Sequence, residues 1–161
     1  MAPETEAPAP MGHEIRLVDL PHRSTAVVRA HVMPSGMADF FAKAFEEVLG
    51  VLDAQGLAPT GPPFARHLPR GDGFEVTAGF PVDRAVRPSG HVLPDELPGG
   101  PVATTLHTGA YDAVGAAYTE TTDWLEAHGL TATDAPWEAY LDGPEVPQPR
   151  TQLFVPCRAE A

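Results

Sequence analysis

The chain has 161 residues, of which 43% are hydrophobic, and its formal net charge is −12. This length suits one domain, and no apolar run approaches the roughly 18 residues needed to cross a bilayer. The acidic charge argues against a general affinity for nucleic acid, because phosphate contacts need Lys and Arg. A single cysteine excludes an internal disulfide, and acids near the N-terminus do not fit an export signal, so we expect a soluble cytoplasmic protein.

Residues 1–13 are rich in Pro, Ala and Glu, and they predict a disordered tail before a domain that spans residues 14–161. Pro and Gly then recur at short intervals, which is typical of short strands and turns around a few helices. Seven strands are predicted near residues 13–20, 24–33, 64–68, 74–82, 100–108, 136–141 and 150–157.

Two helices are predicted from apolar side chains at three- and four-residue spacing, one within residues 37–56 and one within 111–129. Their inner positions are Phe41, Phe45, Val48 and Leu52 in the first helix, and Val114, Tyr118, Thr121 and Leu125 in the second. A glycine, Gly56 or Gly129, is placed to end each helix in a left-handed turn. We expect Tyr118, on the inner stripe, to pack in the core.

The two helices and the strands after them correspond at an offset of 73 residues. Between Gly36 and Leu68, 11 of 33 positions are identical to the residue 73 positions later, where chance would give roughly two or three. An internal duplication explains this best. The predicted fold is an α+β domain of two βαββ halves, about 24–83 and 100–157, with pseudo-twofold symmetry, antiparallel sheets and a central ligand groove between the halves.

The stretch APWEAYLDGPEV breaks this symmetry. Alternation along a strand sends Glu138 and Tyr140 to one face and Trp137 to the other. At the offset of 73 residues Glu138 corresponds to Ala65, so the first half does without the acid. If Glu138 were needed only for the fold, the equivalent strand of the first half would be expected to carry a similar acid.

Three explanations of Glu138 follow from its chemistry, because a carboxylate in an apolar groove is costly unless it is paired, hydrogen-bonded or protonated. It could compensate a bound cation, with cation–π attraction of about 0.5 to 2 kcal/mol from each nearby aromatic face. It could instead act as a general base. The structural alternative is a strand-end acid that is solvated or paired with an arginine such as Arg66 or Arg150.

Taken together, five segments resemble the GyrI-like (gyrase-inhibitor-like) small-molecule-binding domain, which also forms the effector-binding part of certain multidrug-sensing transcription activators. These segments are DGFEVTAGFPV, HTGAYDAVGAAY, WLEAHGL, PWEAYLDGPEV and QLFVPC. The resemblance implies a tandem βαββ domain whose groove takes amphipathic, aromatic, often cationic compounds. It also implies that Glu138 meets the ligand's positive charge. The stacking residues would be Trp137, Tyr140, Tyr111, Phe80 and Phe154.

Three functions are compatible with this resemblance. The first is stand-alone capture or sensing of lipophilic, aromatic, often cationic drugs or toxins. The second is a hydrolase that opens the cyclopropane ring of DNA-alkylating natural products and so confers antibiotic resistance. Glu138 would then activate water by taking its proton, and Tyr140 would donate a hydrogen bond to the substrate's carbonyl oxygen, which gains negative charge as the ring opens. The third is an interaction with DNA gyrase through surface acids such as Asp95 and Glu96.

Other partners are not expected. The multidrug-sensing activators carry a helix-turn-helix segment that binds DNA, and we expect no such segment in the residues before Glu14. We therefore expect no direct contact with nucleic acid. The seven histidines form no metal-binding motif with Cys157 or with one another, so we expect no metal and no cofactor.

Overall fold

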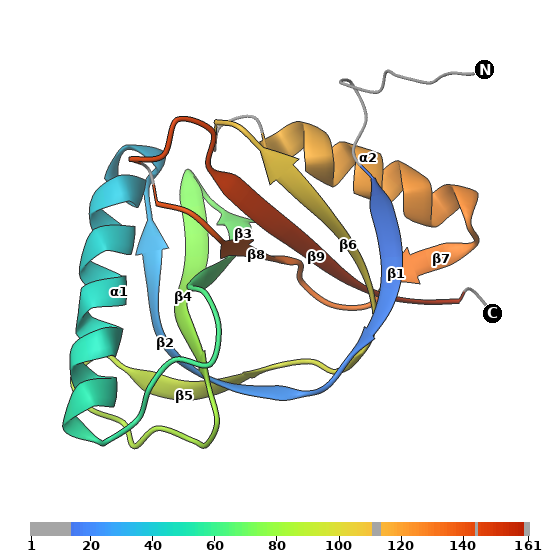
Figure 1. Cartoon of the computed structure of the whole chain (residues 1–161). Helices are drawn as coiled ribbons and strands as arrows, with labels where there is room; N and C mark the ends of the chain where they lie inside the picture. The colour runs from blue at the N-terminus through green and yellow to red at the C-terminus, as the bar shows by residue number, and fades with distance from the viewer. Residues whose placement is uncertain (1–13, 111–113, 144, 160–161) are drawn as a thin grey trace.

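The computed structural model describes residues 14–110, 114–143 and 145–159 (Figure 1). Within them lie the helices α1 (Met37–Ala54) and α2 (Val114–Ala127) and a 3-10 turn, η3 (Pro34–Gly36). The described strands are β1 (Ile15–Leu20), β2 (Arg23–Val32), β3 (Phe64–Arg70), β4 (Gly73–Val82), β5 (Leu93–Leu97), β6 (Gly100–Thr108), β7 (Leu130–Ala132), β8 (Trp137–Tyr140) and β9 (Arg150–Ala159).

The strands form one curled antiparallel sheet in the order β1-β6-β9-β8-β3-β4-β2-β5, with β7 paired to β9. The six central strands read the same from either end, because β6, β9 and β8 of the second half mirror β2, β4 and β3 of the first. This palindromic order is the one that two repeats related by a twofold axis produce. The predicted α+β class is confirmed, and β3 and β8 meet at the centre.

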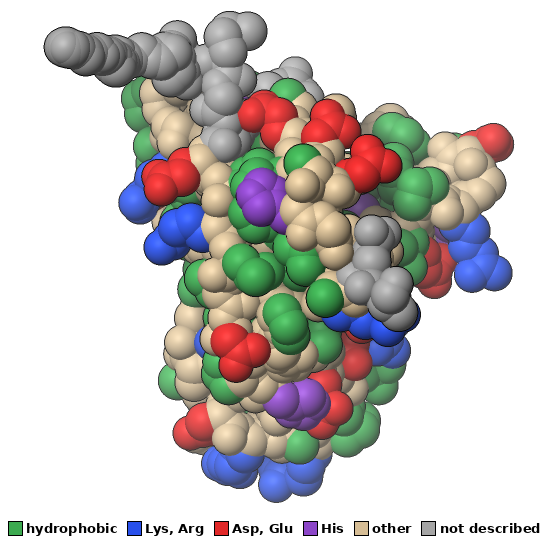
Figure 2. All heavy atoms as spheres, turned by 90° about the vertical axis from the view of Figure 1, so that its right-hand side faces the viewer, with side chains coloured by type: hydrophobic (Ala, Val, Ile, Leu, Met, Phe, Trp, Pro, Cys, Tyr) green, Lys and Arg blue, Asp and Glu red, His purple; other side chains and the backbone are tan. Residues whose placement is uncertain are grey.

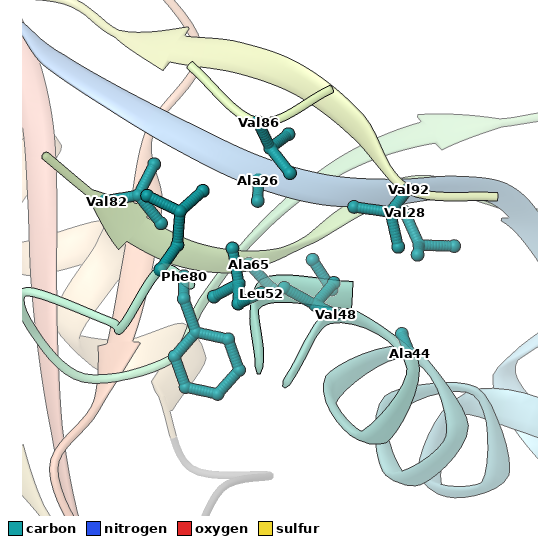
Figure 3. Close-up of a cluster of buried hydrophobic side chains, with 12 residues drawn as sticks. Ala26, Val28, Ala44, Val48, Leu52, Ala65, Phe80, Val82, Val86 and Val92 are labelled. Carbon is teal, nitrogen blue, oxygen red and sulfur yellow. The ribbon is translucent and has the colours of Figure 1, made fainter. Parts of the chain in front are cut away.

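Both helices cover the same face of the sheet. Ala65, Glu138 and Leu153 are partners across three neighbouring strands, so their side chains share a face. Helix α1 buries Val48 in one cluster with Ala65 (Figure 3), and α2 buries Leu125 in a second cluster with Leu153. The two helices therefore pack over opposite halves of the sheet, and the strands between these halves carry Glu138.

The predicted helix ends are confirmed, and a third glycine lies in the first hairpin turn. Gly56 and Gly129 follow the two helices with φ of 70° and 67°, in the left-handed region that glycine adopts without a steric penalty. Gly71 has φ 60° in the two-residue turn that joins β3 to β4. These glycines fix where each helix stops and where the first hairpin reverses.

Two of the described strands, β5 and β7, were not predicted from the sequence. Strand β5 pairs with the outer side of β2, and β7 adds three residues beside β9. The segment of β5, LPDEL, combines a proline with two acids, which are poor strand formers, and it is an edge strand that pairs on one side only. Tertiary pairing therefore overrides a weak local preference.

The face in Figure 2 carries hydrophobic side chains between acidic and basic ones, and its described residues present no continuous acidic surface. Within the part of the chain that the structure describes, no helix is both long and apolar enough to span a bilayer.

Candidate functional site: a buried acid among aromatic rings

Glu138 lies where the two halves of the sheet meet. It pairs with Ala65 across β8 and β3, and these two residues are also 73 positions apart, as equivalent residues of the repeats are. A pair that exchanges with itself under the symmetry must lie on the pseudo-twofold axis. The acid that breaks the sequence symmetry therefore stands at its structural centre.

The Glu138 carboxylate is buried and held by two phenols. The residue is only 9% exposed. Tyr118 of α2 donates a hydrogen bond to Oε2 at 2.7 Å, and Tyr140 of β8 donates to Oε1 at 3.1 Å. Because each carboxylate oxygen accepts a phenol hydrogen bond, part of the cost of burying the charge is offset and its orientation is fixed.

The structure contradicts one part of the structural alternative, the pairing of Glu138 with an arginine, and burial leaves little of the residue to solvent. Arg66 lies on the other sheet face, 3.5 Å from Asp134 and with its guanidinium 5.7 Å from the centre of the Trp137 ring. Arg150 makes a two-point contact with Asp142 at 2.8 and 3.1 Å. Among the described residues, no lysine or arginine forms an ion pair with Glu138, so a buried acid is left without a permanent counter-charge.

His67 is the one basic side chain within 4 Å of the Glu138 carboxylate in the described parts of the chain. Its Nδ1 lies 3.9 Å from Oε2. Burial lowers the pKa of His67, and the negative charge of Glu138 opposes part of this lowering. His67 is the counterpart of Tyr140 in the first repeat, so equivalent positions of the two halves flank the acid on the axis.

Aromatic rings surround the acid on the side of α1. Phe41 lies 5.6 Å from the His67 ring and 5.9 Å from the Tyr140 ring. Phe45 lies 6.4 Å from Tyr140 and 5.6 Å from Phe80. Phe41, Phe45, His67 and Tyr140 are only partly buried, so they form a partly accessible aromatic surface beside the Glu138 carboxylate.

The structure divides the predicted site residues. It places Glu138, Tyr140 and Phe80 on the sheet face that the helices cover. Trp137 and Phe154 stack on each other at 5.1 Å on the opposite face, where Trp137 packs in a separate core cluster. Tyr111 lies outside the described residues. Trp137 and Phe154 therefore cannot stack on a ligand that contacts Glu138 unless the sheet rearranges.

The positions of Phe80 and Phe154 follow from register. Trp137 pairs with Phe154, whereas its repeat counterpart Phe64 pairs with Gly79. The counterpart of Phe154 is therefore Gly79 and not Phe80. A one-residue difference turns a strand side chain to the other face, which explains why only Phe80 reaches the side of Glu138.

Tyr118 is the site residue that the sequence interpretation assigned to the core alone. It does pack against the second cluster, but its hydroxyl reaches Glu138. Burial raises the pKa of Tyr118, and the charge of Glu138 and the hydrogen bond between them raise it further. The phenol therefore keeps its proton and donates a hydrogen bond to the carboxylate throughout the neutral range.

No group of three His, Cys, Asp or Glu side chains suited to a metal ion occurs in residues 14–110, 114–143 and 145–159. Cys157 is buried, and burial raises the pKa of its thiol, which is the state of an unreactive core cysteine.

The duplicated fold and the aromatic surface around one buried acid define a small-molecule-binding domain. A model of the GyrI-like small molecule binding domain matches residues 13–158, and the chain therefore belongs to this family. No curated protein sequence matches the chain.

Several solved structures share the fold. The C-terminal domain of EcmrR has a TM-score of 0.79 and 21% identity, over 91% of this chain and 98% of that one. In the EcmrR–DNA complex the TM-score is 0.80, and this chain spans 59% of the length of EcmrR. SAV2435 bound to tetraphenylphosphonium has a TM-score of 0.63 and 15% identity, over 90% and 94% of the two chains. A hydrolase from Listeria innocua has a TM-score of 0.65 and 12% identity, over 90% and 92%.

Proposed function

We propose that the chain binds amphipathic aromatic cations at the Glu138 site and so captures or senses drugs or toxins in the cytoplasm. The observation that supports this most is the buried Glu138 carboxylate, which has two neutral donors but no arginine or lysine partner among the described residues. A ligand cation would supply the missing charge.

The rings around Glu138 suit the rest of such a ligand. Phe41, Phe45 and Tyr140 are partly exposed, and a cation that lies over the face of one of these rings within 6 Å gains about 0.5 to 2 kcal/mol. They demand few directional hydrogen bonds, so the site would select for charge sign and aromatic shape more than for one compound. The structure of SAV2435 with tetraphenylphosphonium, a lipophilic aromatic cation, is consistent with this chemistry on the same fold.

A fluorescence titration with a planar cationic dye tests this proposal. Wild type should bind the dye, and Glu138→Gln should weaken binding by about 1.5 kcal/mol or more, roughly tenfold, because the lost contact involves a desolvated charge. Asp95→Asn, which changes an acid on edge strand β5, is the matched control and should bind as wild type does. Equal affinity in wild type and Glu138→Gln would contradict the proposal.

Hydrolysis of a strained ring is the second candidate, and the contact between Glu138 and Tyr140 favours it. A carboxylate and a phenol 3.1 Å apart could take a proton from water and donate one to a carbonyl oxygen as a cyclopropane ring opens. Mass spectrometry of a cyclopropane-bearing alkylator after incubation should then show a product heavier by one water. Unchanged substrate with wild type would contradict this candidate while leaving the binding proposal intact.

The gyrase hypothesis makes a separate prediction. A protein that acts through surface acids should bind gyrase equally well with Glu138→Gln and lose binding with Asp95→Asn. A pull-down of purified gyrase by the three proteins checks this directly.

A further inference from the structure

A cavity lies on the face of β8 opposite Glu138. The cavity has a volume of about 220 Å³, and its walls include Trp137, Ala139 and Leu141. These residues alternate along the chain with Glu138 and Tyr140, and alternate residues of a strand point to opposite faces. The sheet itself therefore separates this cavity from the buried acid.

The walls of the cavity are aromatic and rigid. Trp137 and Phe154 stack with ring centres 5.1 Å apart and planes 15° from parallel, and Phe64 is almost completely buried beside them. The edges of the curled sheet close in through Leu20 at the end of β1 and Leu97 at the end of β5. Four prolines complete the wall: Pro21, Pro62, Pro81 and Pro98. Prolines have little freedom to lose when a ligand binds.

The charge of this cavity is opposite to that of the Glu138 site. Its described lining contains no acid, and Arg23 is its one cationic residue. The Arg23 guanidinium has a long hydrogen bond to Thr60, at 3.4 Å, and within the described ranges it makes no ion pair. A Cβ atom on Gly61 would lie 3.2 Å from its Nη2, so the backbone packs closely against the guanidinium and restricts it.

Among the described residues of the wall, Gln152 is the one polar side chain besides Arg23. Its amide nitrogen donates to Thr104 at 3.1 Å, which fixes the amide. An apolar cavity with aromatic walls and one arginine that has no ion-pair partner among the described residues is complementary to an aromatic ring that carries a carboxylate, because guanidinium and carboxylate match in charge and geometry.

We propose that this cavity is a second ligand site that binds small aromatic carboxylates, with the ring against Trp137 and Phe154 and the carboxylate on Arg23. A cavity of about 150 Å³ holds one benzene ring, so the larger volume here suits two fused rings. This site is independent of the proposed function of the Glu138 site and selects the opposite charge.

Calorimetric titration with 2-naphthoate and the neutral analogue 2-naphthalenemethanol tests this assignment. Wild type should bind naphthoate more tightly than the alcohol. Arg23→Met, which keeps the length of the side chain, should weaken naphthoate roughly fivefold, the size of a partly exposed charge contact, and leave the alcohol unchanged. Ala139→Leu, which fills the cavity, should weaken both ligands.

Two comparisons separate this site from the other. Glu138→Gln should bind naphthoate as wild type does, and Ala139→Leu and Arg23→Met should bind the cationic dye as wild type does, which also shows that both are folded. The proposal is overturned if wild type does not bind naphthoate, or if Arg23→Met weakens naphthoate and the alcohol equally. It is also overturned if naphthoate affinity depends on Glu138 and not on Arg23.

Discussion

Ala65 and Glu138 face each other across β3 and β8 and are equivalent residues of the two repeats. This relationship explains why only one half carries the acid. Two carboxylates at a directly opposed pair would repel each other, so one of the two positions is apolar, and Ala65 is fully buried in the cluster under α1. The two repeats therefore differ at Ala65 and Glu138, although the strands around this pair are related by the twofold axis.

Moving the acid across the axis is the first prediction. Glu138→Ala should weaken cation binding roughly tenfold or more, and Ala65→Glu added to it should restore much of that affinity, because Ala65 packs in one cluster with Phe41, Phe45 and Tyr140. A dye titration of the two variants and wild type measures this. Failure of a folded double variant to exceed Glu138→Ala would show that the acid needs its own strand.

The second prediction concerns pH. Because burial lowers the pKa of His67, the imidazole is neutral at pH 7 and gains its proton only below its usual value of about 6.5. That proton places a positive charge 3.9 Å from Glu138, where it competes with a ligand cation. Cation affinity should be level above pH 7 and fall at pH values below the usual histidine pKa of about 6.5.

His67→Gln should flatten the part of this pH profile that His67 causes, whereas His31→Gln, at an exposed histidine, should leave the profile as in wild type. The lowered pKa of His67 also affects the stability of the fold. The folded state holds His67 less protonated than the unfolded state does, so the free energy of unfolding should fall as pH drops below about 6.5. An unchanged profile in His67→Gln would remove His67 from the site.

Tyr118 provides the third prediction. Its 2.7 Å hydrogen bond to a buried carboxylate should make Tyr118→Phe less stable by about 1 to 2 kcal/mol in chemical denaturation. Tyr140→Phe, which removes a longer bond of 3.1 Å, should cost less. In a Glu138→Gln background the loss from Tyr118→Phe should shrink, and an equal loss in both backgrounds would attribute the effect to packing alone.

Much of this site follows from the sequence once the repeat is recognised. Alternation placed Glu138 and Tyr140 together and Trp137 on the other face, as the structure has them. The offset of 73 residues also relates His67 to Tyr140 and Phe45 to Tyr118. Tyr118, Tyr140 and His67 lie within 4 Å of the Glu138 carboxylate, and Phe45 packs on Tyr140. The equivalences could therefore have identified His67 and Tyr118.

The positions of Phe80 and Phe154 and the cavity beside Arg23 could not be predicted from the sequence, because they depend on strand register and on tertiary pairing. Phe80 and Phe154 occupy matching strands, but the pairing of Phe154 with Trp137 sends Phe154 to the other face. Neither alternation within one strand nor the repeat offset carries that information, because strand pairing is set by the turn and loop lengths between strands. The cavity beside Arg23 depends likewise on how far the sheet curls.

Two glycines give the fourth prediction. A Cβ atom on Gly79 would overlap the backbone carbonyl of Ala26 on β2, so Gly79→Ala should lower the free energy of unfolding by about 2 kcal/mol or more. Gly50 lies in α1 with open space around it, and Gly50→Ala should raise stability by about 0.5 to 1 kcal/mol. Equal effects of the two changes would contradict the close approach of β4 to β2.

The fifth prediction is the most direct test of Glu138 as the partner of a ligand cation. Isothermal calorimetry with tetraphenylphosphonium and with neutral triphenylphosphine oxide measures how strongly the protein prefers the charge. Wild type should prefer the phosphonium, and Glu138→Gln should lose about tenfold of that preference while its affinity for the oxide stays constant. A preference that survives in Glu138→Gln, or an equal weakening of both ligands, would contradict the account.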